Sequence, residues 1–191
     1  MKKRIISIVL ALVIGIAGGL GTSAIIREKQ LMRALASQSF YALRGLSQNL
    51  NSILTTGECP GSVSEDMQRN LIALGSSISV ANRFTQGHKQ ISGGVYDLCR
   101  ALGTWTASIN DTEVAGLLWD GAISAKEMEF VRILQADIDA LLAPFYAEDK
   151  LNLKAGGIKW SEMRPTLGEF MQKWDTWNPA FGEHWRGLNV E

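Results

Sequence analysis

The side chains most often used in catalysis and metal binding are scarce in this chain. Its 191 residues include two histidines, His88 and His184, and two cysteines, Cys59 and Cys99. These four residues show none of the ligand spacings that are typical of zinc sites. The sequence also lacks the GxSxG, HExxH and CxxC motifs and a phosphate-binding loop. We therefore predict that the protein is not an enzyme and that it uses no metal or other cofactor.

Two pairs of carboxylates lie close enough in the sequence to be considered as a general acid and a general base. Glu127 precedes Glu129 by two positions, and Asp137 precedes Asp139 in the same way. Both pairs fall in a segment with helical periodicity, and side chains two residues apart point to different faces of a helix. Neither pair can face one substrate, so we expect all four side chains to be solvated.

Flat aromatic faces can stack on sugar rings, so the six tryptophans are candidates for binding. Trp105, Trp160 and Trp174 fall on apolar helix faces, where they are expected to belong to the core. The other three lie in connections or near the C-terminus, where an aromatic side chain is available to a partner. The residues predicted to contact a partner are Trp119, Trp177, Phe181, His184 and Trp185.

An uncharged stretch near the N-terminus determines where the rest of the chain lies. It runs from Ile5 to Ile26 and reads IISIVLALVIGIAGGLGTSAII. As a helix that rises about 1.5 Å per residue, it is long enough to cross the hydrocarbon core of a bilayer. Lys2, Lys3 and Arg4 precede it, and basic residues hold that end in the cytoplasm. We predict a single-pass protein of the cytoplasmic membrane, with residues 1–26 as the anchor and the remainder outside.

The same stretch could be a signal peptide that is removed after export. Thr22 with Ala24, or Gly19 with Gly21, would supply the small residues of a cleavage site. However, the stretch is longer than the usual apolar core of a signal peptide and continues directly into a helical pattern, which favours an uncleaved anchor. Gly15 and Gly19 have the spacing at which two membrane helices pack closely, and they could join two anchors into a homodimer.

Beyond the anchor, the chain is long enough for one domain and is slightly acidic. Three of the 19 basic residues precede the anchor, so the remainder carries 16 basic and 19 acidic residues. A net charge of about −3 argues against nucleic acid as a partner. The remaining length of about 165 residues suffices for one hydrophobic core.

Cys59 and Cys99 both fall in the part that is predicted to be exported, where a disulfide would be stable. A bond between them would close a loop of about 41 residues and would stabilise the fold by roughly 4 kcal/mol on the chain-entropy model. The alternative is two unpaired thiols, with Cys99 acting as a small apolar residue on a helix face. The sequence leaves both alternatives open.

Apolar residues recur at intervals of three and four through most of the chain, as in amphipathic helices. The pattern predicts helices over residues 28–54, 63–84, 91–109, 128–145 and 160–174. The sequences starting at Ser62 and Ser124 have the capping-box form, with Glu65 and Glu127 three residues later, and predict helix starts. We expect no strand between residues 110 and 121.

The predicted fold class is therefore all-α. It comprises an N-terminal transmembrane helix followed by an extracytoplasmic antiparallel bundle of four or five helices. The bundle occupies residues 27–177, and residues 178–191 form an aromatic-rich tail.

Several short motifs, taken in order, resemble the N-terminal extracytoplasmic region of the YpeB-type spore-germination proteins. Residues 94–98 (GVYDL) are similar to that family's G-D-F/Y helix, and residues 121–127 (GAISAKE) to its G-x-x-L-[ST]-x-x-E helix start. Residues 158–162 (IKWSE) are similar to its basic-W-x-[ED] step. Residues 179–184 (PAFGEH) resemble the G-P-F-S-[ED]-H segment that opens the family's C-terminal half.

The chain also departs from that family. Ala180 and Gly182 stand where the family has Pro and Ser, and the sequence ends at Glu191, where the family continues into PepSY-type domains. The resemblance implies a non-enzymatic membrane protein that tethers, stabilises or localises a spore-cortex lytic enzyme during sporulation or germination. An alternative is an extracytoplasmic sensory or ligand-binding bundle that signals through a membrane partner, and a third is a divergent enzyme that acts on the cell wall.

Overall fold

The computed structural model describes the backbone of residues 2–84, 98, 107–109, 112–114, 123, 125–148 and 152–172. Side chains are described from Ala24 onward, except those of residues 107–109, 112–114 and 126. The described part of the chain is mostly helical, as predicted. Trp105, Trp174 and most of the third predicted helix lie outside it.

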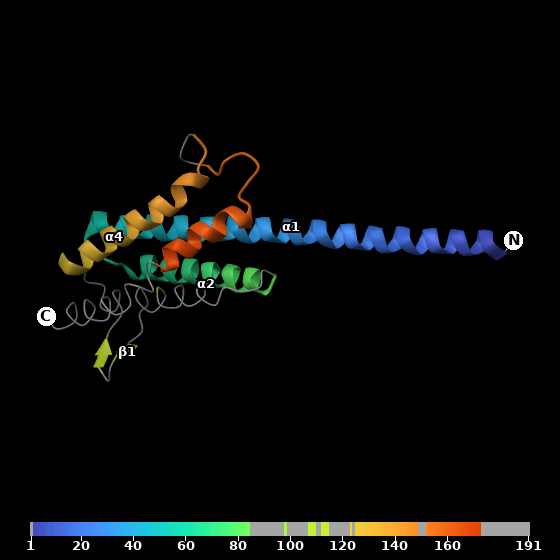
Figure 1. Cartoon of the computed structure of the whole chain (residues 1–191). Coiled ribbons are helices and arrows are strands. Elements are labelled where there is room, and N and C mark those ends of the chain that lie inside the picture. The colour runs from blue at the N-terminus through green and yellow to red at the C-terminus, as the bar shows by residue number, and fades with distance from the viewer. Residues whose placement is uncertain are drawn as a thin grey trace.

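The first helix, α1, is continuous over Lys2–Thr56 and projects well beyond the other helices at its N-terminal end (Figure 1). It joins the predicted anchor to the predicted helix 28–54 without a break. Among the described residues, no helix combines the length and the apolar character that a membrane span requires. Residues 5–23 of the predicted anchor lie outside those whose side chains are described.

The C-terminal end of α1 is closed by local hydrogen bonds. The hydroxyl groups of Thr55 and Thr56 donate to the carbonyl oxygens four residues earlier, at 2.8 and 3.0 Å. Gly57 then adopts a φ of 75° and donates its amide to the carbonyl of Ile53 at 2.8 Å. A positive φ is readily adopted by glycine, which ends the helix and turns the chain back.

The second helix, α2 (Gly61–Phe84), runs back beside α1, in the direction of its N-terminal end (Figure 1). The predicted end near Phe84 is confirmed. The predicted start is wrong by two residues, because the carbonyl of Pro60 accepts the amides of Val63 and Ser64 at 2.9 and 3.1 Å and the helix begins at Gly61. Ser62 therefore lies in the first turn and does not cap the helix.

The helix α4 (Ala125–Leu142) begins directly after Ser124, as the capping-box pattern predicted. It was expected to continue to Phe145. However, a short 3-10 turn, η1 (Ala143–Phe145), replaces its last turn and contains Pro144. Proline has no amide hydrogen for the helix ladder, and its ring clashes with the preceding turn.

After η1 two short segments of the chain pair in antiparallel orientation. Tyr146 pairs with Leu153, and the amide of Ala147 donates to the carbonyl of Asn152 at 2.8 Å. Gly156 and Gly157 follow with φ values of 88° and 72°, a backbone conformation that glycine adopts readily. The last described helix occupies residues 160–172, within the predicted range.

The expectation of no strand is wrong. Strand β1 (Ala107–Ile109) pairs antiparallel with β2 (Thr112–Val114), with Ile109 opposite Thr112. Two residues, Asn110 and Asp111, separate the strands in the sequence and lie outside the described residues. The helical spacing that ended at Ile109 was misleading because Ile, Thr and Val also favour strands.

The core forms where the apolar faces of α1, α2, α4 and helix 160–172 meet. Phe40 of α1 is fully buried, and the centre of its ring lies 5.2 Å from the centre of the Tyr146 ring in an edge-to-face arrangement. Leu98 is also buried in this core. Between α1 and α4, the buried Ser47 hydroxyl donates to a carboxylate oxygen of Asp139 at 2.5 Å. Asp139 is therefore solvated on one side but also bonds across the helix interface, which the sequence did not indicate.

Candidate functional site

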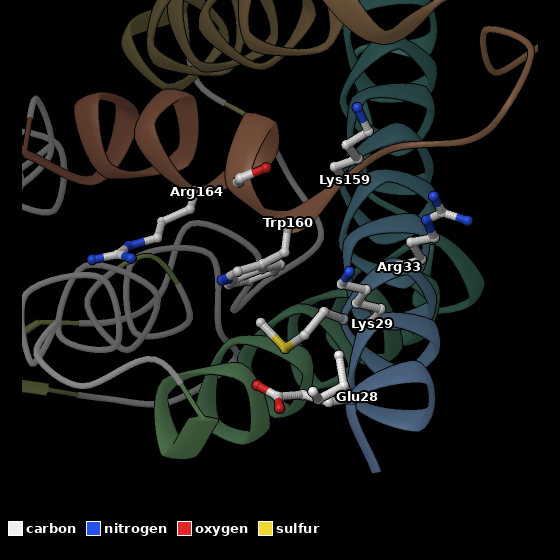
Figure 2. A pocket seen from close by; sticks show the side chains of 9 residues that line it. Glu28, Lys29, Arg33, Lys159, Trp160 and Arg164 are labelled. Atoms are coloured by element: carbon white, nitrogen blue, oxygen red, sulfur yellow. The ribbon is translucent and has the colours of Figure 1, made fainter. Parts of the chain in front are cut away.

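A pocket of about 560 Å³ lies between α1 and the start of helix 160–172 (Figure 2). Four basic residues and one acidic residue are among those that line it, and we call it the cationic pocket. The lining residues are Ile25, Glu28, Lys29, Met32, Arg33, Lys159, Trp160, Ser161 and Arg164.

One wall of the cationic pocket is a single face of α1. Its residues, at positions 25, 28, 29, 32 and 33, are spaced by three and four, so they lie above one another along the helix. Continuing by the same steps leads to Ala36, Phe40 and Leu43, which are buried in the core. The face that packs the core thus carries charged side chains, Glu28, Lys29 and Arg33, at its end nearest the predicted anchor.

The opposite wall is formed by the first turns of helix 160–172. The amides of Glu162 and Met163 donate to the carbonyl of Lys159 at 3.0 and 3.1 Å, which fixes the helix start. Pro165 lies in the second turn of this helix, where it has no amide to donate to the carbonyl of Ser161, an exposed residue. Lys159, Trp160 and Arg164 therefore project from one short segment.

Two lysines hold the carboxylate of Glu162 at this helix start. Lys154 Nζ donates to Glu162 Oε2 at 2.9 Å, and Lys159 Nζ lies 3.6 Å from Oε1. The hydrogen bond from Lys154 is the main reason that the pKa of Glu162 is below its usual range. A negative charge in the first turn is also favoured by the helix dipole. Glu162 thus connects the preceding turn to the wall of the pocket.

Trp160 is the central side chain of the lining. It is 4% exposed, which confirms the prediction that it belongs to the core. However, its Nε1 is buried and has no hydrogen-bond partner among the described residues. In Figure 2 the indole lies in the middle of the pocket, with Lys29, Arg33 and Lys159 on the α1 side and Arg164 on the other. The indole nitrogen points toward the side of Arg164.

The electrostatics of the pocket favour an anion. Lys29, Arg33, Lys159 and Arg164 oppose one lining carboxylate, that of Glu28. Lys159 shares Glu162 with Lys154, and Arg164 has a polar contact of its own. Lys29 and Arg33 make no ion pair in the part of the chain that the structure describes. Unpaired cations can hold a phosphate or carboxylate group, and the buried indole N–H lies on the Arg164 side of the same pocket.

The residues predicted from the sequence to contact a partner are not brought to this pocket by the described structure. Trp119, Trp177, Phe181, His184 and Trp185 all lie outside the described residues. Of the two ends of the predicted anchor, Ile26 is 52% exposed on α1, and the side chain of Ile5 is not described.

Cys59 is a buried free thiol, so in this structure it has the unpaired state that the sequence left open. Its proposed partner, Cys99, lies outside the described residues. Burial raises the pKa of the Cys59 thiol to about 11. A thiol with such a pKa is almost entirely protonated at neutral pH and is a poor nucleophile.

The carboxylate pairs of α4 are separated as expected. Glu129 is exposed and forms an ion pair with Arg132, whereas Asp139 accepts the hydrogen bond from Ser47. Glu127 and Asp137 are half-buried, and each has a polar contact of its own. In the described part of the chain, no three His, Cys, Asp or Glu side chains cluster as metal ligands would.

The sequence did not predict the cationic pocket. Its signal was present in α1, where charged residues occupy the continuation of the core face at positions 28, 29 and 33. Which residues lie opposite them depends on how helix 160–172 packs, and helical periodicity carries no information about that.

Comparison of the chain with known families, with curated proteins and with solved structures gives no match. The similarity to the YpeB-type proteins therefore remains a prediction from short motifs.

Proposed function

We propose that the protein is a non-enzymatic, membrane-anchored helical bundle that holds a partner protein at the outer surface of the cytoplasmic membrane. The observation that carries this proposal is the continuity of α1 over Lys2–Thr56. A single helix joins the uncharged stretch 5–26 to the buried core positions that begin at Leu35. In this proposal residues 1–26 are the transmembrane anchor, and the following helices form the extracytoplasmic antiparallel bundle.

A continuous helix is a stiff connection. Between Ile26 and Leu35 it rises about 14 Å at 1.5 Å per residue. The bundle would therefore sit close to the bilayer at a fixed height, because no flexible linker lies between the two. This geometry suits a tether that keeps a partner near the membrane.

The resemblance to YpeB-type proteins supports a cell-wall lytic enzyme of the spore cortex as the partner. The contacts would come from the aromatic residues Trp119, Trp177, Phe181 and Trp185, together with His184. The protein would then reside in the forespore or spore membrane and would control how much lytic enzyme is present there.

The experiment that tests this proposal compares the amount and location of the lytic enzyme in three strains. These lack the protein, carry the full chain, or carry residues 27–191 behind a cleavable signal peptide. A tether predicts loss of the enzyme from the membrane fraction in the first and third strains. Normal amounts of the enzyme in the membrane fraction of the deletion strain would contradict the proposal.

A ligand-binding sensory bundle is the second candidate, and the cationic pocket is the observation that favours it. Such a bundle would respond to an anionic ligand and signal through another membrane protein. Crosslinking of the full chain in cells would separate the two functions, because a sensor predicts recovery of a signalling protein and a tether predicts recovery of a wall hydrolase.

A further inference from the structure

The cationic pocket has the composition and the position of a site for a phosphate group. We propose that it binds the phosphate of an anionic lipid headgroup, next to the point at which α1 leaves the membrane. The choice of a lipid as the source of the phosphate rests on the proposed anchor. The proposal of a phosphate site does not rest on the anchor, because the residues that form the site are all in the described part of the chain.

The first argument is that basic side chains from two elements of the fold line the pocket. Lys29 and Arg33 lie one turn apart on α1, and Lys159 and Arg164 come from the other wall. Ammonium and guanidinium groups make strong, charge-assisted hydrogen bonds to phosphate oxygens. Because Lys29 and Arg33 are exposed and make no described ion pair, binding an anion there breaks no existing ion pair of theirs.

The second argument is the unpartnered donor of Trp160. A buried N–H group without an acceptor costs free energy, so most buried indole nitrogens have a partner. Within the described structure Trp160 Nε1 has none, although other parts of the residue line a pocket with room for several non-hydrogen atoms. A phosphate oxygen on the Arg164 side of the indole would supply the missing acceptor after a small shift of the ring that exposes the nitrogen.

The third argument is the height of the pocket above the predicted anchor. Lys29 and Arg33 follow Ile26 by three and seven residues, which places them about 5 and 10 Å further along the helix. The headgroup layer on each side of a bilayer is about 5–8 Å thick. Lys29 would lie within the headgroup layer and Arg33 just above it. Glu28 adds one acceptor to the lining, which suits a hydroxyl group next to the phosphate, as in phosphatidylglycerol.

The test measures binding to the full-length protein in detergent. Phosphatidylglycerol and phosphatidylcholine are titrated and followed by native mass spectrometry, and inorganic phosphate is titrated by calorimetry. We expect phosphatidylglycerol to bind at least tenfold more tightly than phosphatidylcholine. Raising the salt concentration should weaken the binding, since the attraction is electrostatic and the charged side chains are partly exposed to solvent.

The variants distinguish binding in the cationic pocket from a general effect of the positive charge on the protein surface. The pair Lys29→Gln with Arg33→Gln should weaken phosphatidylglycerol binding at least tenfold. The control pair, Arg69→Gln with Arg132→Gln, removes two other exposed cations, from α2 and α4, and should change phosphatidylglycerol binding less than twofold. Trp160→Phe keeps the ring but removes the N–H donor, and we expect a three- to tenfold loss. Circular dichroism verifies that each variant is folded.

Each result either supports the site or excludes it. Pocket-dependent binding of phosphatidylglycerol assigns the lipid headgroup, whereas pocket-dependent binding of inorganic phosphate alone supports the phosphate site with a soluble source. Equal binding of the two lipids without phosphate binding would overturn the proposal, as would an equal loss in the control pair. The assay contains no lytic enzyme, so its failure is distinct from failure of the tether.

Discussion

Cys59 lies in the short connection between α1 and α2, where its thiol is buried and protonated. Burial disfavours the charged thiolate, and this is why its pKa rises from 9.0 to about 11. Such a thiol acts as a small apolar side chain of the core. The chemistry available to this residue is therefore set by how tightly the connection packs.

This burial predicts slow alkylation and a pH-dependent stability. Because the folded pKa exceeds the unfolded value, the contribution of the neutral thiol is complete below pH 9 and is lost as the pH rises through about 11. The loss should amount to about 1–3 kcal/mol. Chemical denaturation between pH 8 and 11 measures it, with Cys59→Ala as the control that should show a flatter profile. Rapid modification of Cys59 by iodoacetamide in the folded protein at pH 8 would contradict this prediction.

At the same scale, the sequence predicted some individual residues and missed others. Trp160 was correctly placed in the core, because its position on a stripe of apolar residues depends only on helix geometry. The role of Lys29 and Arg33 in a pocket was missed, because it depends on Lys159 and Arg164, which are more than 120 positions away in the sequence. The four carboxylates of α4 were predicted to be solvated, but Ser47 bonds Asp139 across a helix interface.

Among the elements, α1 and α2 approach each other closely at Gly45. A Cβ atom at this position would lie 2.6 Å from Nδ2 of Asn70 on α2, which is closer than non-bonded atoms tolerate. Glycine inside a helix otherwise costs about 1 kcal/mol relative to alanine. Its presence here permits the two backbones to pack against each other around the Asn70 side chain.

The close approach predicts a coupling between Gly45 and Asn70. Gly45→Ala alone should change the stability by less than about 1 kcal/mol, because the cost of shifting the half-buried Asn70 side chain offsets the gain in helix propensity. In an Asn70→Ala background the same change should stabilise by about 0.5–1 kcal/mol, since only the helix-propensity gain remains. A double-mutant cycle from urea unfolding measures the coupling. Additive effects of the two substitutions would show that the close contact is not a constraint on the fold.

The elements themselves were mostly predictable, and the exceptions have a common cause. The end of α1 follows from Gly57, whose positive φ stops the helix, and the end of α2 near Phe84 follows from the end of its apolar stripe. The hairpin at 107–114 was missed because a short segment that contains Ile109, Thr112 and Val114 satisfies both a helical spacing and a strand composition. Pro144 shortened α4 because proline has no amide hydrogen for the helix ladder. This rule is local and could have been applied to the sequence.

For the whole molecule, the decisive feature is that α1 serves two roles. Its C-terminal half supplies a large part of the core, and its N-terminal end extends away from the bundle (Figure 1). Periodicity predicted that one helix would continue from the anchor into the bundle. It could not predict how α2, α4 and helix 160–172 are arranged around it, because that depends on packing between distant segments.

The proposed anchor predicts how the molecule would associate with a membrane. The full chain should stay in the membrane pellet after an alkaline carbonate wash, with its N-terminus intact. The double variant Leu10→Arg with Ile14→Arg should be released from the membrane pellet. Each charge at the centre of a spanning helix costs about 2.5–3.5 kcal/mol on the insertion scale. Arginine at Ala34 and Gln38, which are exposed on the same helix beyond the apolar stretch, should leave it in the pellet.

The fold of the bundle should be independent of this attachment. Its buried positions on α1 begin at Leu35, so removal of residues 1–26 leaves the described core complete. The truncated chain should therefore unfold cooperatively with a helical circular-dichroism spectrum. A mature N-terminus that begins near residue 25 in cells would identify a cleaved signal peptide. In that case the bundle would be a free exported domain, and the tether would lose its anchor while the core and the cationic pocket remained intact apart from the first residue of its lining.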